Sequence, residues 1–79
     1  MFKELKETLD ELKINYCNVA EGCIIITRDN KTRMAIICDK KYDLCAFYIR
    51  NATKDTIGME DNLGKLITTI ARYYEGEDT

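Results

Sequence analysis

The short links between successive strand-like segments constrain the fold of this chain more than any other feature. The links are Glu21-Gly22, Asn30-Lys31 and residues 40–43. A parallel crossover needs about a dozen residues or more, so segments joined by links this short must be antiparallel neighbours. Asn30 also tolerates the positive φ that a tight hairpin turn requires. The sequence therefore predicts an antiparallel meander in the middle of the chain.

Segments rich in β-branched and aromatic residues supply the strands of this meander. We expect four of them, in the spatial order 1-2-3-4, at Tyr16–Ala20, Cys23–Asp29, Thr32–Asp39 and Leu44–Asn51. These four segments are the only strands that the sequence predicts.

A helix is expected at each end of the meander. Apolar residues spaced by three and four positions predict the first one, at Phe2, Leu5, Leu9 and Leu12. The second helix is expected from Met59 to Glu75, with Thr56 as its N-cap and Gly76 as its stop. The predicted fold class is thus α+β, and the 79 residues are expected to form a single compact domain, 1–79.

The register predicted from the turn positions distributes the strand residues over two faces. Placing Asn30 and Lys31 at one hairpin tip and Lys40 and Lys41 at the next leaves side chains alternating between the faces. One predicted face collects Cys23, Ile25, Met34, Ile36, Cys38, Cys45, Phe47 and Ile49. The other collects Ile24, Ile26, Ala35, Ile37, Leu44, Ala46 and Tyr48, with Arg28, Arg33 and Arg50 toward one end.

Both predicted faces are apolar, whereas a half-buried antiparallel sheet normally alternates apolar and polar residues. Two arrangements of the helices remain open: one helix on each face, or both helices on the first face. The second arrangement would leave Ile24, Ile26, Ile37 and Leu44 on an exposed apolar surface, which is typical of an interaction site.

Arginines form the most site-like cluster in this register. Arg28, Arg33 and Arg50 are expected near Tyr48, and like charges placed across strands are unfavourable unless something neutralises them. The neutralising group is either an external anion or acidic partner, or an internal acidic residue such as Asp29 or Asp39.

The four cysteines, Cys17, Cys23, Cys38 and Cys45, contain no C-x-x-C spacing. Their apolar neighbours favour a role as small buried hydrophobic residues. Two alternatives stay open: a soft-metal or redox cluster of Cys23, Cys38 and Cys45, or disulfides in an exported protein. We expect no metal and no cofactor.

Missing residue types bear on function. The chain has no His and no Ser, so it cannot build a Ser–His or Cys–His nucleophile pair or a His-ligated metal site. It also shows no apolar signal region and no apolar run long enough to span a membrane. We therefore expect a cytoplasmic chain that is not an enzyme and does not contact membranes.

The function predicted from these observations is protein interaction. The partner would be a second copy of the chain, or a larger protein for which it serves as an adaptor or as an inhibitor of the kind that phages and mobile elements encode. The first alternative is a nucleic-acid-binding module using the Arg/Tyr end of the sheet, although the net charge of −2 disfavours it. The second alternative is a metal or redox protein based on the cysteines.

Overall fold

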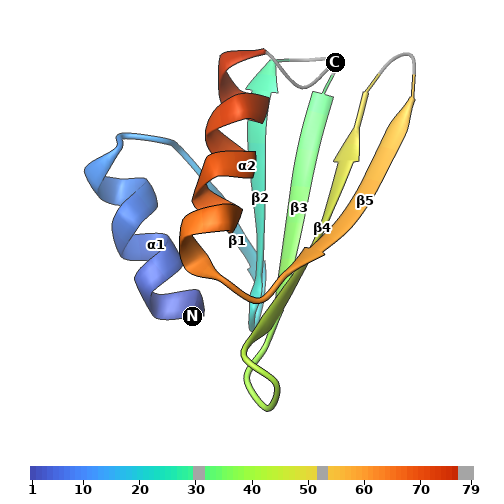
Figure 1. The fold of residues 1–79 in the computed structure, drawn as a ribbon. Helices are drawn as coiled ribbons and strands as arrows, with labels where there is room; N and C mark the ends of the chain where they lie inside the picture. Colours follow the sequence, from blue (N-terminus) through green and yellow to red (C-terminus); the bar gives the residue numbers. More distant parts are fainter. Residues whose placement is uncertain (30–31, 52–53, 77–79) are drawn as a thin grey trace.

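A computed structural model describes residues 1–29, 32–51 and 54–76 of the chain. It shows an α+β fold in which a helix precedes and another follows an antiparallel sheet (Figure 1). In chain order the elements are α1 (Phe2–Glu11), β1 (Cys17–Ala20), β2 (Cys23–Asp29), β3 (Thr32–Asp39), β4 (Leu44–Arg50), β5 (Asp55–Glu60) and α2 (Leu63–Glu75). The fold class, the end helices and the antiparallel meander are confirmed. The expected hairpin tip at Asn30-Lys31 lies outside the described residues.

The predicted number of strands is wrong, because the sheet has five strands in the order β1-β2-β3-β4-β5. Residues 55–60, expected to hold the cap and first turn of the last helix, form the edge strand β5 instead. Thr56 and Ile57 are β-branched, and Gly58 lies directly opposite Phe47 of β4. A side chain at Gly58 would overlap the Phe47 ring, so the glycine lets this ring lie across the edge strand.

The last helix therefore begins later than expected, at Leu63. Asn62 is its N-cap in place of Thr56, and the Asn62 side chain accepts a hydrogen bond of 3.1 Å from the Lys65 amide. The expected stop is confirmed, since Gly76 has a φ of 82°, in the left-handed region that glycine adopts without a steric penalty.

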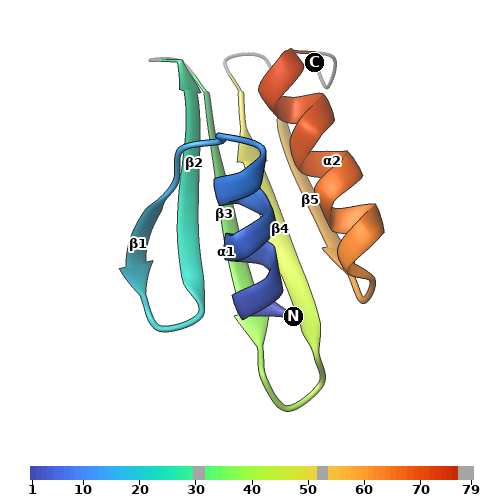
Figure 2. The same ribbon diagram turned by 90° about the vertical axis from the view of Figure 1, so that its left-hand side faces the viewer.

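Both helices pack on the same side of the sheet (Figures 1 and 2). The buried residues form one cluster between the helices and this side. They comprise Leu5, Leu9, Ile14, Ile24, Ile26, Met34, Ile36, Cys45, Phe47, Ile49, Leu66, Ile70 and Tyr73. Of the two arrangements left open by the sequence, the structure has the one with both helices on one face.

The register of β2 against β3 differs from the prediction by one residue. Ile24 pairs with Ile36 and Ile26 pairs with Met34, because the register shifts at a bulge between Thr27 and Asp29. A one-residue shift moves every side chain of a strand to the other face. Ile24 and Ile26 are consequently buried under the helices, and their predicted place on an exposed face is wrong.

The register of β3 against β4 differs by two residues, since Cys38 pairs with Cys45 and Ile36 with Phe47. A two-residue shift leaves every side chain on the same face of the sheet. The predicted faces of β3 and β4 are therefore confirmed although their predicted pairs are wrong.

Tyr73 of α2 holds the bulge of β2 in place. Its hydroxyl accepts a hydrogen bond of 3.2 Å from the Arg28 amide, donates to the Ile26 carbonyl at 3.3 Å, and lies 3.3 Å from the Thr32 hydroxyl. Arg28 also donates from Nη1 to the Tyr73 carbonyl at 2.7 Å, near the C-terminus of α2. This network joins the end of α2 to the position where the register shifts.

Replacing Tyr73 by Phe should therefore destabilise the domain by about 1–3 kcal/mol, the cost of leaving buried polar groups unpaired. The chemical shifts of Ile26, Arg28 and Thr32 should change most. Urea unfolding and an amide NMR spectrum measure both effects, with Tyr74→Phe, on the half-buried neighbour in the same turn, as the control. Equal losses of stability in the two variants would contradict this role for Tyr73.

Candidate protein-interaction face

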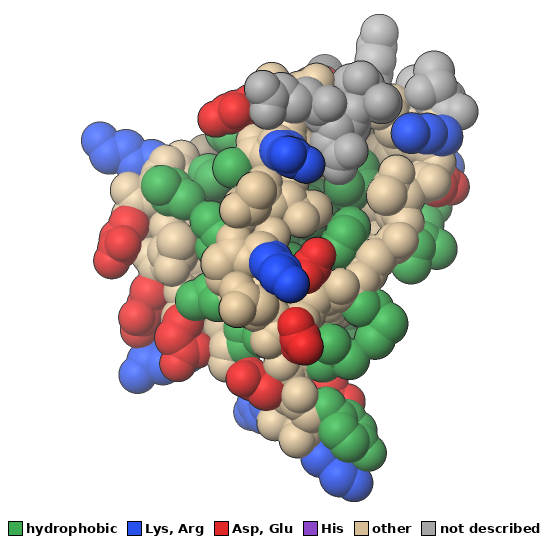
Figure 3. Space-filling model, in the orientation of Figure 1, with side chains coloured by type: hydrophobic (Ala, Val, Ile, Leu, Met, Phe, Trp, Pro, Cys, Tyr) green, Lys and Arg blue, Asp and Glu red, His purple; other side chains and the backbone are tan. Residues whose placement is uncertain are grey.

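The side of the sheet turned away from the helices, hereafter the open face, carries most of the exposed large apolar residues on the strands. Ile57 is 75% exposed, Met59 60%, Ile37 58% and Tyr48 36%. Hydrophobic side chains are visible along the right-hand margin of Figure 3, on the side away from the two helices. An exposed apolar surface of this kind on a small domain is typical of an interaction site.

Strand pairing arranges the open face in rows that run across the strands. The first row is charged: it contains Thr27, Arg33, Arg50 and Asp55. Two apolar rows follow, one with Cys17, Ile25, Ala35, Tyr48 and Ile57, and one with Ala20, Cys23, Ile37, Ala46 and Met59. Asp39 and Leu44 make the fourth row, at the opposite end from the arginines.

Arg33 and Arg50 lie directly opposite each other in the first row. No carboxylate within the described ranges forms an ion pair with either guanidinium group. Arg50 also pairs in register with Asp55 of β5, whose carboxylate accepts a hydrogen bond of 2.7 Å from the Tyr48 hydroxyl. That hydrogen bond raises the pKa of Tyr48 above its ordinary value, so the hydroxyl is a neutral donor at neutral pH.

Arg28 does not belong to this cluster. It lies on the helix-covered side, where its guanidinium group is 5.2 Å from the Tyr73 ring and its Nε is 3.4 Å from Oδ2 of Asp29. The expected grouping of three arginines is therefore wrong. Arg28 is instead paired with an internal acidic residue, Asp29, as one of the two alternatives proposed. The structure brings together Arg33, Arg50 and Tyr48.

The other end of the open face carries acidic groups. One oxygen of Asp39 accepts a hydrogen bond of 2.8 Å from the Lys41 amide. Glu21 forms an ion pair of 3.0 Å with Lys40, which lowers the pKa of the glutamate through a hydrogen bond and through charge attraction. Glu21, Gly22, Ile37, Cys38, Asp39 and Lys40 line a shallow hollow of about 400 Å³.

The cysteines do not form the cluster that the predicted register implied. Cys38 and Cys45 lie opposite each other on the helix-covered side, with their Cα atoms 4.1 Å apart, and are joined by a disulfide. Cys17 and Cys23 are free thiols in the apolar rows of the open face. The expectation of buried hydrophobic cysteines is confirmed for Cys45, which is completely buried in the core, and is wrong for Cys17, which is exposed.

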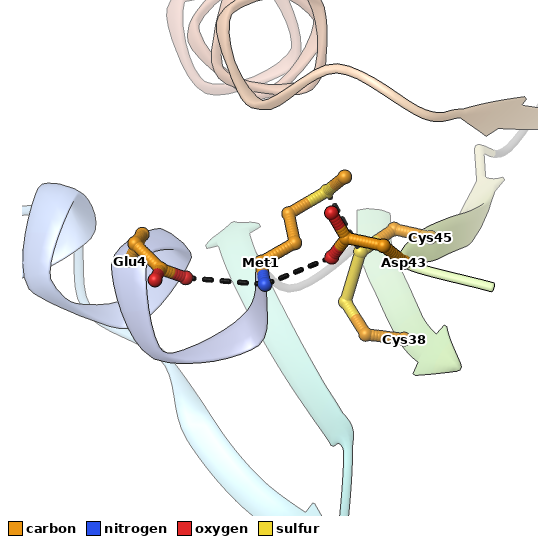
Figure 4. Close-up of a disulfide and its surroundings, with 5 residues drawn as sticks. All are labelled: Met1, Glu4, Cys38, Asp43 and Cys45. Atoms are coloured by element: carbon orange, nitrogen blue, oxygen red, sulfur yellow. Dashed lines mark hydrogen bonds and ion pairs between the residues drawn. A yellow bond between two sulfur atoms is a disulfide. The ribbon is translucent and has the colours of Figure 1, made fainter. Parts of the chain in front are cut away.

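The disulfide lies beside the start of α1 (Figure 4). The Met1 sulfur is 3.4 Å from Sγ of Cys45, and the Met1 ammonium group forms ion pairs of 3.0 Å with Asp43 and 3.1 Å with Glu4. Hydrogen bonds to these carboxylates raise the pKa of the ammonium group, Asp43 having the larger effect. These contacts join α1 to the β3–β4 turn and offer no ligand set for a metal.

Two further findings concern metal-binding groups and membrane-spanning helices among the described residues. No group of three or more His, Cys, Asp or Glu residues within residues 1–29, 32–51 and 54–76 is placed to hold a metal ion. None of the helices built from these residues has the length and apolar character needed to cross a lipid bilayer.

Sequence reasoning identified Ile37, Leu44, Tyr48, Arg33 and Arg50 of the open face and missed its outer strand. Ile57 and Met59 were missed because residues 59–60 were assigned to the last helix and Thr56 was assigned as its N-cap. The β-branched pair Thr56-Ile57 was the signal that could have revealed the strand.

No protein-family model matches this chain, and no curated protein or solved structure shows significant similarity to it.

Proposed function

We propose that this chain is a non-enzymatic protein-binding domain that takes up its partner on the open face. The observation that carries the proposal is the exposure of Ile37, Ile57 and Met59 on the side of the sheet that neither helix covers. An antiparallel sheet with one face in water normally carries polar residues there, so two central rows of apolar residues need another explanation. Burial against a protein partner supplies it.

The composition of the open face supports a protein partner over a nucleic acid. Apolar side chains fill its centre, with acidic Asp39 at one end and Asp55 beside the arginines at the other. A surface that binds phosphate backbones is expected to be dominated by positive charge. Tyr48, the aromatic residue that a stacking function would use, is held at its hydroxyl by Asp55.

The proposal predicts that lysine at two positions of the open face abolishes partner binding and leaves the fold intact. The test variant is Ile37→Lys combined with Ile57→Lys. The matched control is Leu12→Lys, because Leu12 is 51% exposed but lies at the end of α1, on the other side of the molecule. Cross-linking in the cells that produce the protein, followed by mass spectrometry, identifies the partner and measures the amount of the cross-linked species.

Wild-type protein and Leu12→Lys should give the same cross-linked species, whether with another protein or with a second copy of the chain. That species should fall at least about tenfold in the double variant, whose circular dichroism should match the wild type. Equal cross-linking in all three proteins would mean that the open face does not bind the partner.

A further inference from the structure

We propose that the occupant of the open face is a second copy of this chain, packed face to face with its strands running in the opposite direction. This inference rests on the proposed function and specifies its partner. The basis is that the rows of the open face complement themselves when one copy is reversed along the strand direction.

Charge is the first element of this complementarity. Arg33 and Asp39 both lie on the open face of β3, six residues apart and at opposite ends of the strand. Consider a two-fold axis that lies between the two sheets, at right angles to the strands and at the level of Ile36. This axis places Arg33 of each copy over Asp39 of the other. An axis that runs along the strands instead places Arg33 and Arg50 over the arginines of the second copy. Like charges in contact are destabilising, so the reversed arrangement is favoured.

Size is the second element. In the reversed arrangement the two apolar rows lie over each other, since the axis passes at the level of Ile36. Ile37 of one copy then faces Ala35 of the other on β3, and Tyr48 faces Ala46 on β4. Large residues opposite small ones let these two central strands interdigitate at the spacing of about 10 Å that packed sheets adopt. At the β5 edge Ile57 of one copy faces Met59 of the other, so two exposed apolar side chains cover each other there.

The hollow at the Asp39 end of the open face is the third element. Its lining includes Asp39 and the ion pair of Glu21 with Lys40, at the end of the face over which Arg33 of the second copy would lie. In the single chain, Arg33 has no ion pair among the described residues. Association would supply an acidic partner to this exposed guanidinium group.

The size of the face sets the expected strength of association. Five strands about 4.8 Å apart and about 20 Å long make a face on the order of 500 Å² on each copy. A dimer would therefore bury about 1,000 Å² in total, the lower limit for a specific interface. We expect a reversible dimer with a dissociation constant in the micromolar range, visible as a change of mass with concentration.

Charge reversal at the two ends of β3 tests the arrangement by sedimentation equilibrium. Arg33→Asp alone and Asp39→Arg alone should each weaken dimerisation at least about tenfold, because either change places like charges in contact at both symmetric positions. An equimolar mixture of the two variants should associate again, to within about threefold of the wild type, since both contacts in the mixed dimer join Arg to Asp. Lys3→Asp and Glu7→Arg, on the exposed side of α1, are the matched controls and should leave the dimer unchanged.

Each outcome separates this inference from the proposed function. A wild-type chain that is monomeric at all concentrations overturns the second copy as occupant, while loss of a cross-linked partner in the Ile37→Lys, Ile57→Lys variant would still support a protein-binding face. A dimer that both charge reversals leave intact, or a mixture that does not associate again, overturns the reversed arrangement. If the Ile37→Lys, Ile57→Lys variant also gives every cross-linked species of the wild type, the proposed function fails as well.

Discussion

Replacing Ile36 by Asp should unfold the domain, whereas replacing the adjacent Ile37 by Asp should leave it folded. Ile36 is completely buried between the sheet and the helices, and Ile37 is 58% exposed on the open face. An unpaired carboxyl group in an apolar core costs several kcal/mol. That cost is comparable with the whole free energy of unfolding expected for a chain of this size, about 4–12 kcal/mol.

The same substitution at Ile37 exposes its carboxylate to water and should cost no more than about 1 kcal/mol, mainly from the lower strand propensity of Asp. Circular dichroism and urea unfolding of the two variants measure the difference. The pair is internally controlled, because the residues are identical, adjacent and in the same strand. If Ile36→Asp folds as stably as Ile37→Asp, the assignment of the two faces is wrong.

Gly58→Ala should destabilise the domain by about 1–3 kcal/mol, the range for overfilling a packed site. A methyl group at this position would overlap the ring of Phe47, which pairs with Gly58 across β4 and β5. Phe47 is buried, so its ring can move away only by disturbing the core. Urea unfolding measures the loss.

The cause can be isolated with a second substitution. In a Phe47→Leu background the Gly58→Ala change should cost at least about 1 kcal/mol less, because the smaller side chain leaves room for the methyl group. Gly64→Ala in α2 is the control, since alanine is favoured over glycine in a helix by about 1 kcal/mol. The added methyl group there would meet only the cap oxygen of Asn62, at 3.1 Å. The same loss at Gly58 in both backgrounds would exclude the Phe47 ring as its cause.

The sequence by itself determined the antiparallel meander and both end helices. Links of two to four residues leave no path for a parallel connection, so the order of the first four strands followed from link length alone. The apolar spacing at Leu5 and Leu9 determined the buried side of α1 in the same local way, and Gly76 marked the end of α2. Each of these features depends on residues close together along the chain.

The faces of β3 and β4 were also correct, because a two-residue error in pairing preserves the alternation of side chains. The face of β2 was not. Its register depends on the bulge at Arg28, and that bulge is held by Tyr73, which lies 45 residues away in α2. No local pattern around Arg28 encodes a hydrogen bond to so distant a residue.

Tertiary structure alone decided which side of the sheet is exposed. Both faces are apolar in sequence, and the choice depends on where the helices pack: α1 contacts α2, and α2 contacts the edge strand β5. These are contacts between segments far apart in the chain. They turn an ambiguous pattern of apolar residues into a buried core on one side and, on the other, the open face with Arg33 at one end and Asp39 at the other.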